Sequence, residues 1–341
     1  MDLQTLQTRA SSLKALRSFF YNKDYLELDT PLLSPDLIPE SCLEVFQTER
    51  LFPQGSTYSE SEGRSSPRKK DKRPLWLIPS PEIWMKKIIA LHKVNNFQIC
   101  KCFRNGESEG HLHNSEFTML EYYTMNADYL DSLVLTEELL VFMNKKFKQT
   151  EFEQKTINKE RFAKITISQA FLQWAGFDLF EAASKEGEIE KEARNLGLDP
   201  IPGSAIQELY DLIFIHTIEP HLKNENIVFL LDYPAFVPCL AKLSPNGKTV
   251  ERWELYYNGI ELANCYSEET DPQRVKEFFI SKENAKEKNA IVKHKTDHNY
   301  WKLFENGKFP KCSGVAMGVD RLIMALTGKS HIETVLPVNW D

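Results

Sequence analysis

The 341-residue sequence contains no apolar run that approaches the roughly 20 residues of a membrane-spanning helix. Its first 20 residues form an amphipathic polar stretch and lack the basic, apolar and small-residue order of a signal peptide. The six cysteines are scattered and include no CxxC pair, so we do not expect a zinc site. These absences favour a protein of the reducing cytoplasm without a membrane partner.

The sequence also lacks an excess of positive charge, with 42 Lys and Arg against 49 Asp and Glu, a net charge of −7. A protein whose main role is to coat nucleic acid needs concentrated Lys and Arg to bind phosphates. The acidic balance therefore argues against that class, although an anionic ligand such as a nucleotide stays compatible with it. The hydrophobic content of 42% is ordinary for a globular protein and allows a sizeable core.

Helical and strand-like segments are mixed along the chain without an internal repeat or a βαβ rhythm. Asn258-Gly259 separates two strand-like segments, which is a strong hairpin signal. We predict an α+β fold with a central antiparallel sheet flanked by helices, in a single domain over residues 1–341. The expected helices are residues 3–21, 81–92, 130–147 and 274–288, much of 151–226, and a helix entered from the small residues at 314–318; the expected strands are 25–31, 75–78, 96–103, 117–123, 227–233, 251–257 and 259–264.

Residues 54–73 differ in composition from the rest of the chain, because Gly, Ser and Pro lead into a basic cluster at 68–73. This pattern predicts a mobile loop. A solvated insertion is the simpler interpretation, and a docking surface for an acidic partner is the alternative.

Three segments combine charge with glycine in a way that a hydrophobic core does not need. In the first, Arg104 follows a strand and enters a polar turn, and Phe117 lies on the returning strand. A guanidinium can bind phosphate with two hydrogen bonds, and an aromatic ring can stack on a base. Taken alone, the same pattern is also typical of a surface hairpin.

In the second segment, Glu261 interrupts an apolar strand, where a carboxylate is costly unless it is paired or binds a metal such as Mg²⁺. A glutamate at a strand end that faces water is the alternative. In the third segment, small residues from Gly314 to Gly318 lead to Arg321 at the start of a helix, where backbone can approach a ligand closely. This segment is neither a P-loop nor a dinucleotide fingerprint, and a simple capped helix is its alternative.

Together and in this order, the segments resemble the three signature motifs of class II aminoacyl-tRNA synthetases. Residues 26–31 (LELDTP) resemble the first, a dimer-interface motif that ends in proline, residues 103–117 the second, and residues 314–321 the third. The resemblance spans residues 26–326. It implies a synthetase-like catalytic domain that forms a homodimer.

Shorter words, at residues 80–82 (SPE), 113–121 (HNSEFTMLE) and 259–264 (GIELAN), are similar to the lysyl branch. Within it, the chain resembles the short paralogue family of elongation factor P–(R)-β-lysine ligases, which modify a lysine side chain of a protein instead of tRNA. The first motif begins near residue 26, which leaves no room for a preceding anticodon-binding barrel. Ala316 stands where lysyl-tRNA synthetases usually have glycine. One methyl group in a pocket can shift the preference between two similar substrates by roughly 1–3 kcal/mol. Neutral drift from glycine to alanine is the alternative.

The resemblance implies a two-step ligase reaction that uses ATP and Mg²⁺. The carboxylate of (R)-β-lysine or lysine would attack the α-phosphate, and an amine of elongation factor P would then attack the aminoacyl-adenylate. The implied catalytic residues are Arg104 at the α-phosphate, Glu261 at the Mg²⁺ and phosphates, and Arg321 at the far end of the triphosphate. The implied ATP-binding set adds Asn105, Glu107, Asn114, Phe117 (stacked on adenine), Leu262 and Gly318. The implied substrate-binding set is Ser80, Pro81, Glu82, Tyr123, Glu268 and Ala316, with Glu82 and Glu268 binding the two ammonium groups.

The sequence departs from the family pattern at two places. The second motif usually reads Arg-Asn-Glu, but here Gly106 follows Asn105 and the acid is displaced to Glu107, which would substitute for it. Cys265 stands where the family commonly has glycine, either as a tolerated small residue or as a thiol that narrows the pocket. The rival interpretations are a lysine ligase that charges tRNA or another carrier, for which no motif provides a basic surface, and a catalytically idle binding protein.

Overall fold

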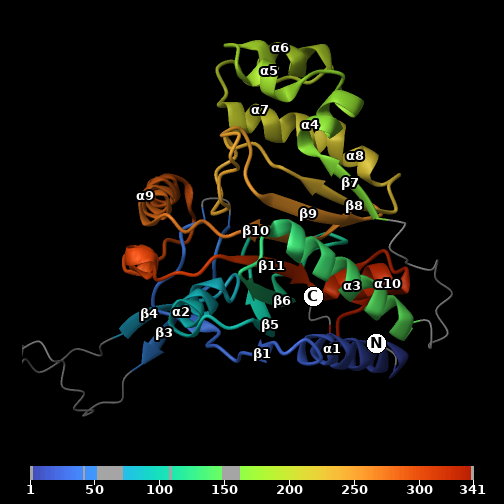
Figure 1. Cartoon of the computed structure of the whole chain (residues 1–341), viewed down its shortest axis with the longest axis vertical. Coiled ribbons are helices and arrows are strands. Elements are labelled where there is room, and N and C mark those ends of the chain that lie inside the picture. Colours follow the sequence, from blue (N-terminus) through green and yellow to red (C-terminus); the bar gives the residue numbers. More distant parts are fainter. Residues whose placement is uncertain (1–2, 41–42, 52–71, 107–109, 148–161, 339–341) are drawn as a thin grey trace, which may run out of the picture.

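The computed structural model describes residues 3–40, 43–51, 72–106, 110–147 and 162–338. Its centre is a twisted eight-stranded sheet whose middle six strands are antiparallel, while β1 pairs with β5 and β7 with β8 in parallel. The predicted antiparallel sheet is therefore confirmed in its centre and extended by parallel pairs at both edges (Figure 1). In spatial order the strands are β1 (Leu26–Glu27), β5 (Asn96–Phe103), β6 (Glu116–Met125), β11 (Cys312–Gly318), β10 (Ile260–Ser267), β9 (Arg252–Tyr257), β8 (Ile227–Leu231) and β7 (Phe162–Thr166).

The two faces of the sheet have different roles, because successive side chains of a strand point to opposite faces. On β6, Leu120 and Tyr122 belong to the largest hydrophobic core, whereas Glu121 and Tyr123 line a cavity on the other face. The same alternation holds along β9 and β11, and along β10 from Ala263 onward. One face is therefore a packed core, and the other presents polar side chains.

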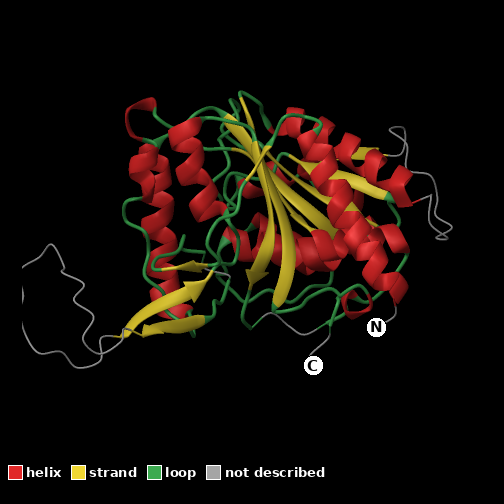
Figure 2. Ribbon diagram, turned by 90° about the horizontal axis from the view of Figure 1, so that it is seen from below, coloured by secondary structure: helices red, strands yellow, loops and turns green. Residues whose placement is uncertain are grey.

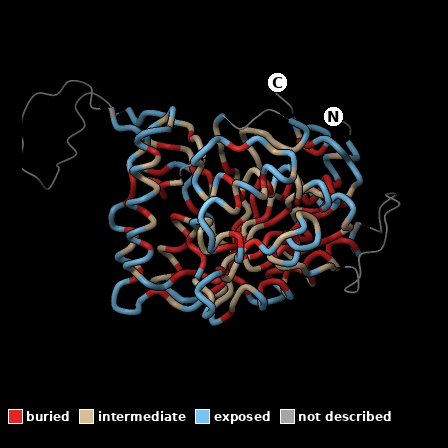
Figure 3. The backbone as a smooth tube through the Cα atoms, turned by 90° about the horizontal axis from the view of Figure 1, so that it is seen from above, coloured by how far each residue is buried: buried red, intermediate tan, exposed pale blue. Residues whose placement is uncertain are grey.

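Three helices cover the core face: α1 (Leu3–Tyr21), α3 (Tyr129–Phe147) and α10 (Val319–Thr327). Apolar side chains of each helix, such as Leu16, Leu140 and Leu322, are almost fully buried against the sheet. Figure 3 shows the resulting buried interior under an exposed shell. Burial at roughly 25 cal/mol per Å² of apolar surface is the main stabilising contribution of these helices.

The helices that cover the other face form two groups, which leave the middle of that face open to the cavities described below. Near β7–β9 lie the short segments α4 (Ile167–Ala170), η2 (Phe171–Ala175), α5 (Leu179–Ala183), α6 (Glu188–Asn195), α7 (Ile206–Ile213), η3 (Phe214–Ile218) and α8 (Glu219–Leu222) (Figure 1). The second group contains α2 (Glu82–His92), α9 (Pro272–Asn289) and the short turns η4 (Tyr300–Leu303) and η5 (Glu305–Gly307). The turn η6 (Ile332–Thr334) follows α10.

A separate three-stranded sheet, β2 (Leu33–Ser34), β4 (Lys72–Leu77) and β3 (Gln47–Leu51), extends from the body of the molecule (Figure 2). Most of the basic loop predicted at 54–73 lies outside the described residues. At its end the prediction was wrong, because Lys72 and Arg73 pair with Leu51 and Arg50 in an antiparallel ladder.

Three further expectations differ from the structure. The strand expected at 25–31 is limited to Leu26–Glu27, which pairs only at the sheet edge with β5. The region 151–226, expected to be mostly helical, also contributes the strand β7, which pairs with β8. Residues 312–318, expected only as the small-residue entry to a helix, form a strand between β6 and β10, while the expected helix after them is confirmed and begins at Val319.

The hairpin at Asn258-Gly259 is confirmed, and both residues have the positive φ angles that its turn requires (49° and 78°). None of the helices within the described ranges is long and apolar enough to cross a membrane.

Candidate active site

Two adjoining cavities open on the polar face of the central sheet. One, of about 320 Å³, is lined by α2 residues and is called here the α2 cavity. The other, of about 280 Å³, is lined by residues at the start of α10 and is called the α10 cavity. The side chains that line both are Glu40, Arg104, Met119, Arg252, Asn264 and Ala316. Because the cavities share these walls, a molecule with two chemically different ends can occupy both.

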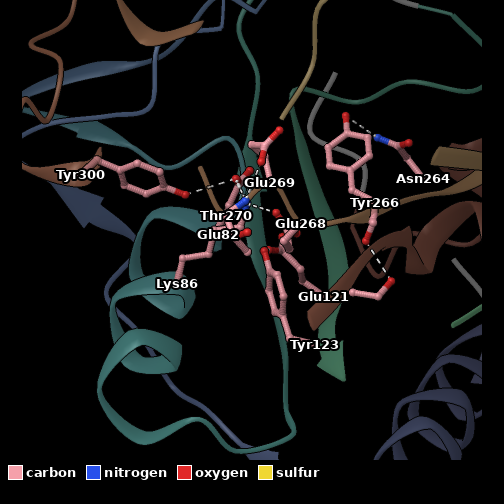
Figure 4. Close-up of polar contacts among 11 residues, drawn as sticks. Glu82, Lys86, Glu121, Tyr123, Asn264, Tyr266, Glu268, Glu269, Thr270 and Tyr300 are labelled. Carbon is pink, nitrogen blue, oxygen red and sulfur yellow. Dashed lines mark hydrogen bonds and ion pairs between the residues drawn. The ribbon is translucent and has the colours of Figure 1, made fainter. Parts of the chain in front are cut away.

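Lys86 is the central cation of the α2 cavity. Its Nζ lies 2.6 Å from Oε1 of Glu82 and 2.6 Å from Oε2 of Glu268, and 1% of its side chain is exposed. Figure 4 shows the ammonium between the two carboxylates, with the Tyr300 hydroxyl also directed at Glu82. Burial alone would lower the Lys86 pKa, but Glu268 and Glu82 raise it well above its usual value, so the ammonium stays charged.

The local sequence explains the position of Glu82 and Lys86. Pro81 is the N-cap of α2 and Glu82 is in its first turn, where a carboxylate favours the helix dipole. Lys86 is one turn later on the same helix face, the i,i+4 geometry in which Glu and Lys meet. Glu268 directly follows β10, which ends at Ser267, so its contact with Lys86 depends on the tertiary structure.

A second acid–hydroxyl pair completes this cavity. The Tyr123 hydroxyl donates a 2.6 Å hydrogen bond to Oε1 of Glu121, and both side chains are buried. Gly314 on the neighbouring strand leaves them room, because a Cβ there would lie 2.5 Å from Tyr123 Cε1 and 2.6 Å from Glu268 Oε1. Gly314, which the sequence pattern singled out, is thus required because Tyr123 and Glu268 lie too close to its backbone to leave room for a side chain.

Burial disfavours the charged form of these carboxyls. It raises the pKa of Glu121 well above its usual value and the pKa of Glu268 to about 7, although Lys86 opposes the shift at Glu268. An ammonium ligand would favour ionisation of both groups. The α2 cavity therefore has the chemistry to bind a compound with positively charged amino groups.

The α10 cavity contains the two arginines predicted to contact phosphates. Arg104 follows β5, its backbone N–H donates to Ser115 O at 2.9 Å, and its guanidinium lies 5.1 Å from the ring centre of Phe117. Arg321 is held by two backbone carbonyls, since Nε donates to Leu112 O at 3.0 Å and Nη1 to Glu261 O at 3.1 Å. Both guanidinium groups therefore have defined positions on the wall of the cavity.

Asp320 holds the start of α10 in place. Its carboxylate pairs with Arg9 of α1 at 2.6 Å and accepts a 2.6 Å hydrogen bond from the backbone N–H of Thr118. Helix α1 and strand β6 therefore converge on the residue before Arg321. Arg9 was not singled out by sequence reasoning, because its partners are 109 and 311 positions away.

Glu261 faces this cavity because of a β-bulge. Its partner on β9 is Tyr256, whereas Ala263 pairs with Leu255, so the register shifts between these positions. The bulge adds one residue to β10 between Glu261 and Ala263. In a regular strand Glu261 would point to the core face, as Ala263 and Cys265 do. Cys265 itself is in the core, 3.3 Å from Ser313 Oγ, and lines neither cavity, so its thiol does not narrow the pocket.

Glu261 is the residue best suited to hold a cation. Its side chain is 44% exposed. Desolvation and the charge of the nearby Glu254 raise the pKa of its carboxyl to about 7, although Arg321 lowers it. Two neighbouring carboxylates fit a Mg²⁺ that keeps water and phosphate ligands. No group of three or more metal-binding side chains occurs within the described ranges.

Most of the predicted site residues come together. The α2 cavity is lined by Ser80, Glu82, Tyr123, Glu268 and Ala316, and the α10 cavity by Arg104, Asn114, Phe117, Glu261, Leu262, Gly318 and Arg321. Two predicted residues line neither cavity: Pro81 caps α2, and Asn105 packs on the segment of Glu44 and Val45. Glu107 lies outside the described residues.

Several residues that line the site were missed by sequence reasoning. Glu121 interrupts an apolar strand, the same signal that singled out Glu261. Arg252 and Glu254 lie two residues apart on one face of β9, where Glu254 also accepts hydrogen bonds from Tyr233 and Tyr256. Asn264 lies in the segment 259–264 that the sequence analysis quoted, but it was given no role. The others had no local signal and are Glu40, Lys86 and Tyr266.

Comparison with known proteins agrees with this architecture. The family model of class II tRNA synthetases (D, K and N) matches residues 2–338. The chain therefore belongs to the class II tRNA synthetase family, and the predicted synthetase-like fold and ligase class are confirmed.

Its relatives narrow the subfamily. Proteins named elongation factor P–(R)-β-lysine ligase are similar along nearly their whole length. The one from Histophilus somni (strain 2336) is 32% identical over 341 residues, 100% of this chain and 96% of the relative. The one from Vibrio vulnificus (strain YJ016) is 33% identical over 338 residues, 98% of this chain and 95% of the relative.

Proposed function

We propose that the protein activates (R)-β-lysine or lysine with ATP and Mg²⁺ and transfers it to a lysine side chain of elongation factor P. The observation that carries this proposal is the pair of adjoining cavities, one built around Glu82, Glu121 and Glu268 and the other around Arg104 and Arg321. The first suits the two ammonium groups of a lysine-type compound, and the second suits a triphosphate. The names of the relatives supply the protein acceptor.

In the first step, the substrate carboxylate attacks the α-phosphorus of ATP, and pyrophosphate leaves. Arg104 lies where the two cavities meet and neutralises the α-phosphate, while Arg321 binds the far end of the triphosphate. The Phe117 ring stacks on adenine, and Asn114, Leu262 and Gly318 form the remaining wall of the nucleotide site.

Glu261, with Glu254 beside it, would hold the Mg²⁺, which when bound neutralises phosphate charge. The Mg²⁺ and ATP assignments rest on these side chains and on the family.

At the other end, Glu82 and Ser80 bind the amino group near the substrate carboxylate, and Glu268 and Tyr123 bind the distal ammonium. A hydrogen bond between charged groups contributes roughly 1.5–3 kcal/mol. Ala316 lines both cavities, which supports a role in choosing between closely related substrates.

Two proposals concern the whole molecule. We infer one catalytic domain, since two of the hydrophobic cores pack on opposite faces of one sheet. We also infer a homodimer through the first motif, because Tyr21, Leu26, Leu32 and Leu33 are apolar side chains 37–53% exposed along one segment. Analytical ultracentrifugation tests the dimer, and a monomer at micromolar concentration would contradict it.

The test of the function is ATP–pyrophosphate exchange with (R)-β-lysine, with α-lysine and without amino acid, followed by transfer to elongation factor P or to lysine tRNA. We expect exchange that depends on a lysine-type substrate, and transfer to the protein alone. Transfer to tRNA would favour the tRNA-charging alternative, and the absence of exchange with either substrate would favour an idle binding protein.

A further inference from the structure

One carboxylate reaches both cavities. Among the described residues that line both cavities, Glu40 is the only acid; the others are two arginines, an asparagine and two apolar residues. Glu40 precedes β3, outside the motifs that carry the family resemblance. Its backbone carbonyl accepts a 3.2 Å hydrogen bond from Nζ of Lys286, which anchors this segment to α9.

The junction between the cavities is the place where the second reaction step occurs, if the proposed function is correct. The adenylate joins the amino acid in the α2 cavity to the phosphate in the α10 cavity, so its carbonyl carbon lies at the junction. The acceptor is a lysine amine, which is an ammonium at neutral pH because its pKa is about 10.4. An ammonium has no lone pair, so it must lose a proton before it attacks.

The other acids of the site already have partners. Lys86 binds Glu82 and Glu268, and Tyr123 donates to Glu121. Glu254 is bound by Arg252 and two tyrosine hydroxyls, Asp320 by Arg9, and Glu261 lies 3.6 Å from Arg321.

No described residue donates a hydrogen bond to the Glu40 carboxylate. The charged and titratable groups that face it are Glu82 and Lys86 of α2, Arg104 after β5, Tyr266 of β10 and Lys286 of α9. Burial, with a contribution from Glu82, raises its pKa above the usual value, and the three cations oppose that shift. Glu40 is thus a carboxylate of increased basicity at the junction, with its oxygens available to a ligand.

We propose that Glu40 is the general base of the transfer step. Its carboxylate binds the acceptor ammonium and takes one N–H proton. The freed lone pair forms the new C–N bond to the adenylate carbonyl carbon, the C–O bond to the phosphate breaks, and AMP leaves with that electron pair. The second N–H proton goes to a phosphate oxygen of the departing AMP, which leaves a neutral amide.

A second role for an acid beside Arg104 must be distinguished from this one. If Glu40 only balanced the charge of Arg104, its loss would affect adenylate formation. A general base for the acceptor is needed only in transfer. Hydroxylamine separates the two, because it is uncharged at neutral pH and attacks an adenylate without a base.

The experiment compares wild type with Glu40→Gln in three assays: ATP–pyrophosphate exchange, hydroxamate formation with hydroxylamine, and transfer to elongation factor P. We expect Glu40→Gln to retain exchange and hydroxamate formation and to lose transfer by roughly 10²–10⁴-fold, the usual contribution of a general base. Its residual transfer should rise about tenfold per pH unit above pH 7, as the free-amine fraction of the acceptor rises.

Glu44→Gln is the matched control, since Glu44 lies four residues further along, accepts hydrogen bonds from the backbone N–H groups of Ile291 and Val292, and lines neither cavity. It should behave as wild type in all three assays. Transfer by Glu40→Gln at the wild-type rate would overturn the proposal, and so would an equal loss in all three assays. Absence of exchange in the wild type is a different result, which would overturn the proposed function itself.

Discussion

The two cavities hold their charged groups in different ways. In the α2 cavity, the acids are bound by other side chains of the same cavity: Lys86 lies between Glu82 and Glu268, and Tyr123 donates to Glu121. In the α10 cavity, Arg321 is held by the backbone carbonyls of Leu112 and Glu261.

The difference shows two routes to a preorganised site. The α2 cavity carries an internal ammonium that partly resembles the proposed ligand, so its acids stay in place before a substrate arrives. The α10 cavity relies on backbone geometry near local motifs, and its Arg321 also lies 3.6 Å from the carboxylate of Glu261. A change in a side chain should therefore disturb stability more in the first cavity and catalysis more in the second.

The largest effect is expected for Lys86→Met, which removes the ammonium that pairs with both Glu82 and Glu268. Loss of one member of a buried ion pair costs about 3–5 kcal/mol, so the free energy of unfolding measured in urea should fall by that amount. Lys185→Met is the matched control, because Lys185 forms an i,i+4 pair of 2.7 Å with Glu181 on the surface and should leave stability unchanged. Equal losses in the two variants would contradict the role of burial.

Arg104→Ala should test the other cavity. Removing one preorganised donor from a developing charge costs on the order of 10²–10³-fold in rate, so ATP–pyrophosphate exchange should fall by that factor while the protein stays folded. Arg194→Ala, a change on the exposed face of α6, should leave exchange intact. Full exchange in Arg104→Ala would show that the assignment of the phosphate-binding arginine is wrong.

The pH dependence of substrate binding tests the role of the buried acids in the α2 cavity, which distinguishes it from the α10 cavity. The Glu268 pKa is about 7 in the free protein, and a diammonium substrate binds its ionised form. Below pH 7 the carboxyl must lose a proton to bind, so the dissociation constant for lysine should rise about fivefold from pH 7 to pH 6 and level off above pH 8.

Calorimetry in two buffers of different ionisation enthalpy measures both this affinity and the proton released. Glu268→Gln should bind more weakly and with a flatter pH dependence. A dissociation constant for the wild type that is constant between pH 6 and pH 8 would contradict the assignment of the titrating group.

The smallest effect is expected for Cys265→Ala. The thiol is 1% exposed and packs in the core face, away from both cavities. Stability should fall by about 1 kcal/mol or less, within the range for loss of a small buried group, and the Michaelis constants for ATP and lysine should not change. A change in either constant would mean that the residue contacts the substrate sites after all.

The sequence determined much of the fold on its own. Alternation along residues 117–123 predicts β6, and the hairpin signal at Asn258-Gly259 predicts the strands on either side of it. Helical periodicity predicts α1 and α3, and the charged segment 274–288 predicts the surface helix α9, each to within a few residues. The motif residues Arg104, Phe117 and Arg321 were also recognisable, because each lies in a local pattern of strand, turn or helix start. These features depend on neighbours in the chain, which a sequence displays directly.

Tertiary structure decided the rest, because those features depend on partners far apart in the chain. In a strand with regular alternation, Glu261 would point into the core on the same face as Ala263. Only the bulge opposite β9 directs it toward the α10 cavity. Lys86 looks like an ordinary helix lysine until β10 brings Glu268 within 2.6 Å of it. Glu40 has no motif at all, and only the meeting of two cavities gives its carboxylate a place in the proposed chemistry.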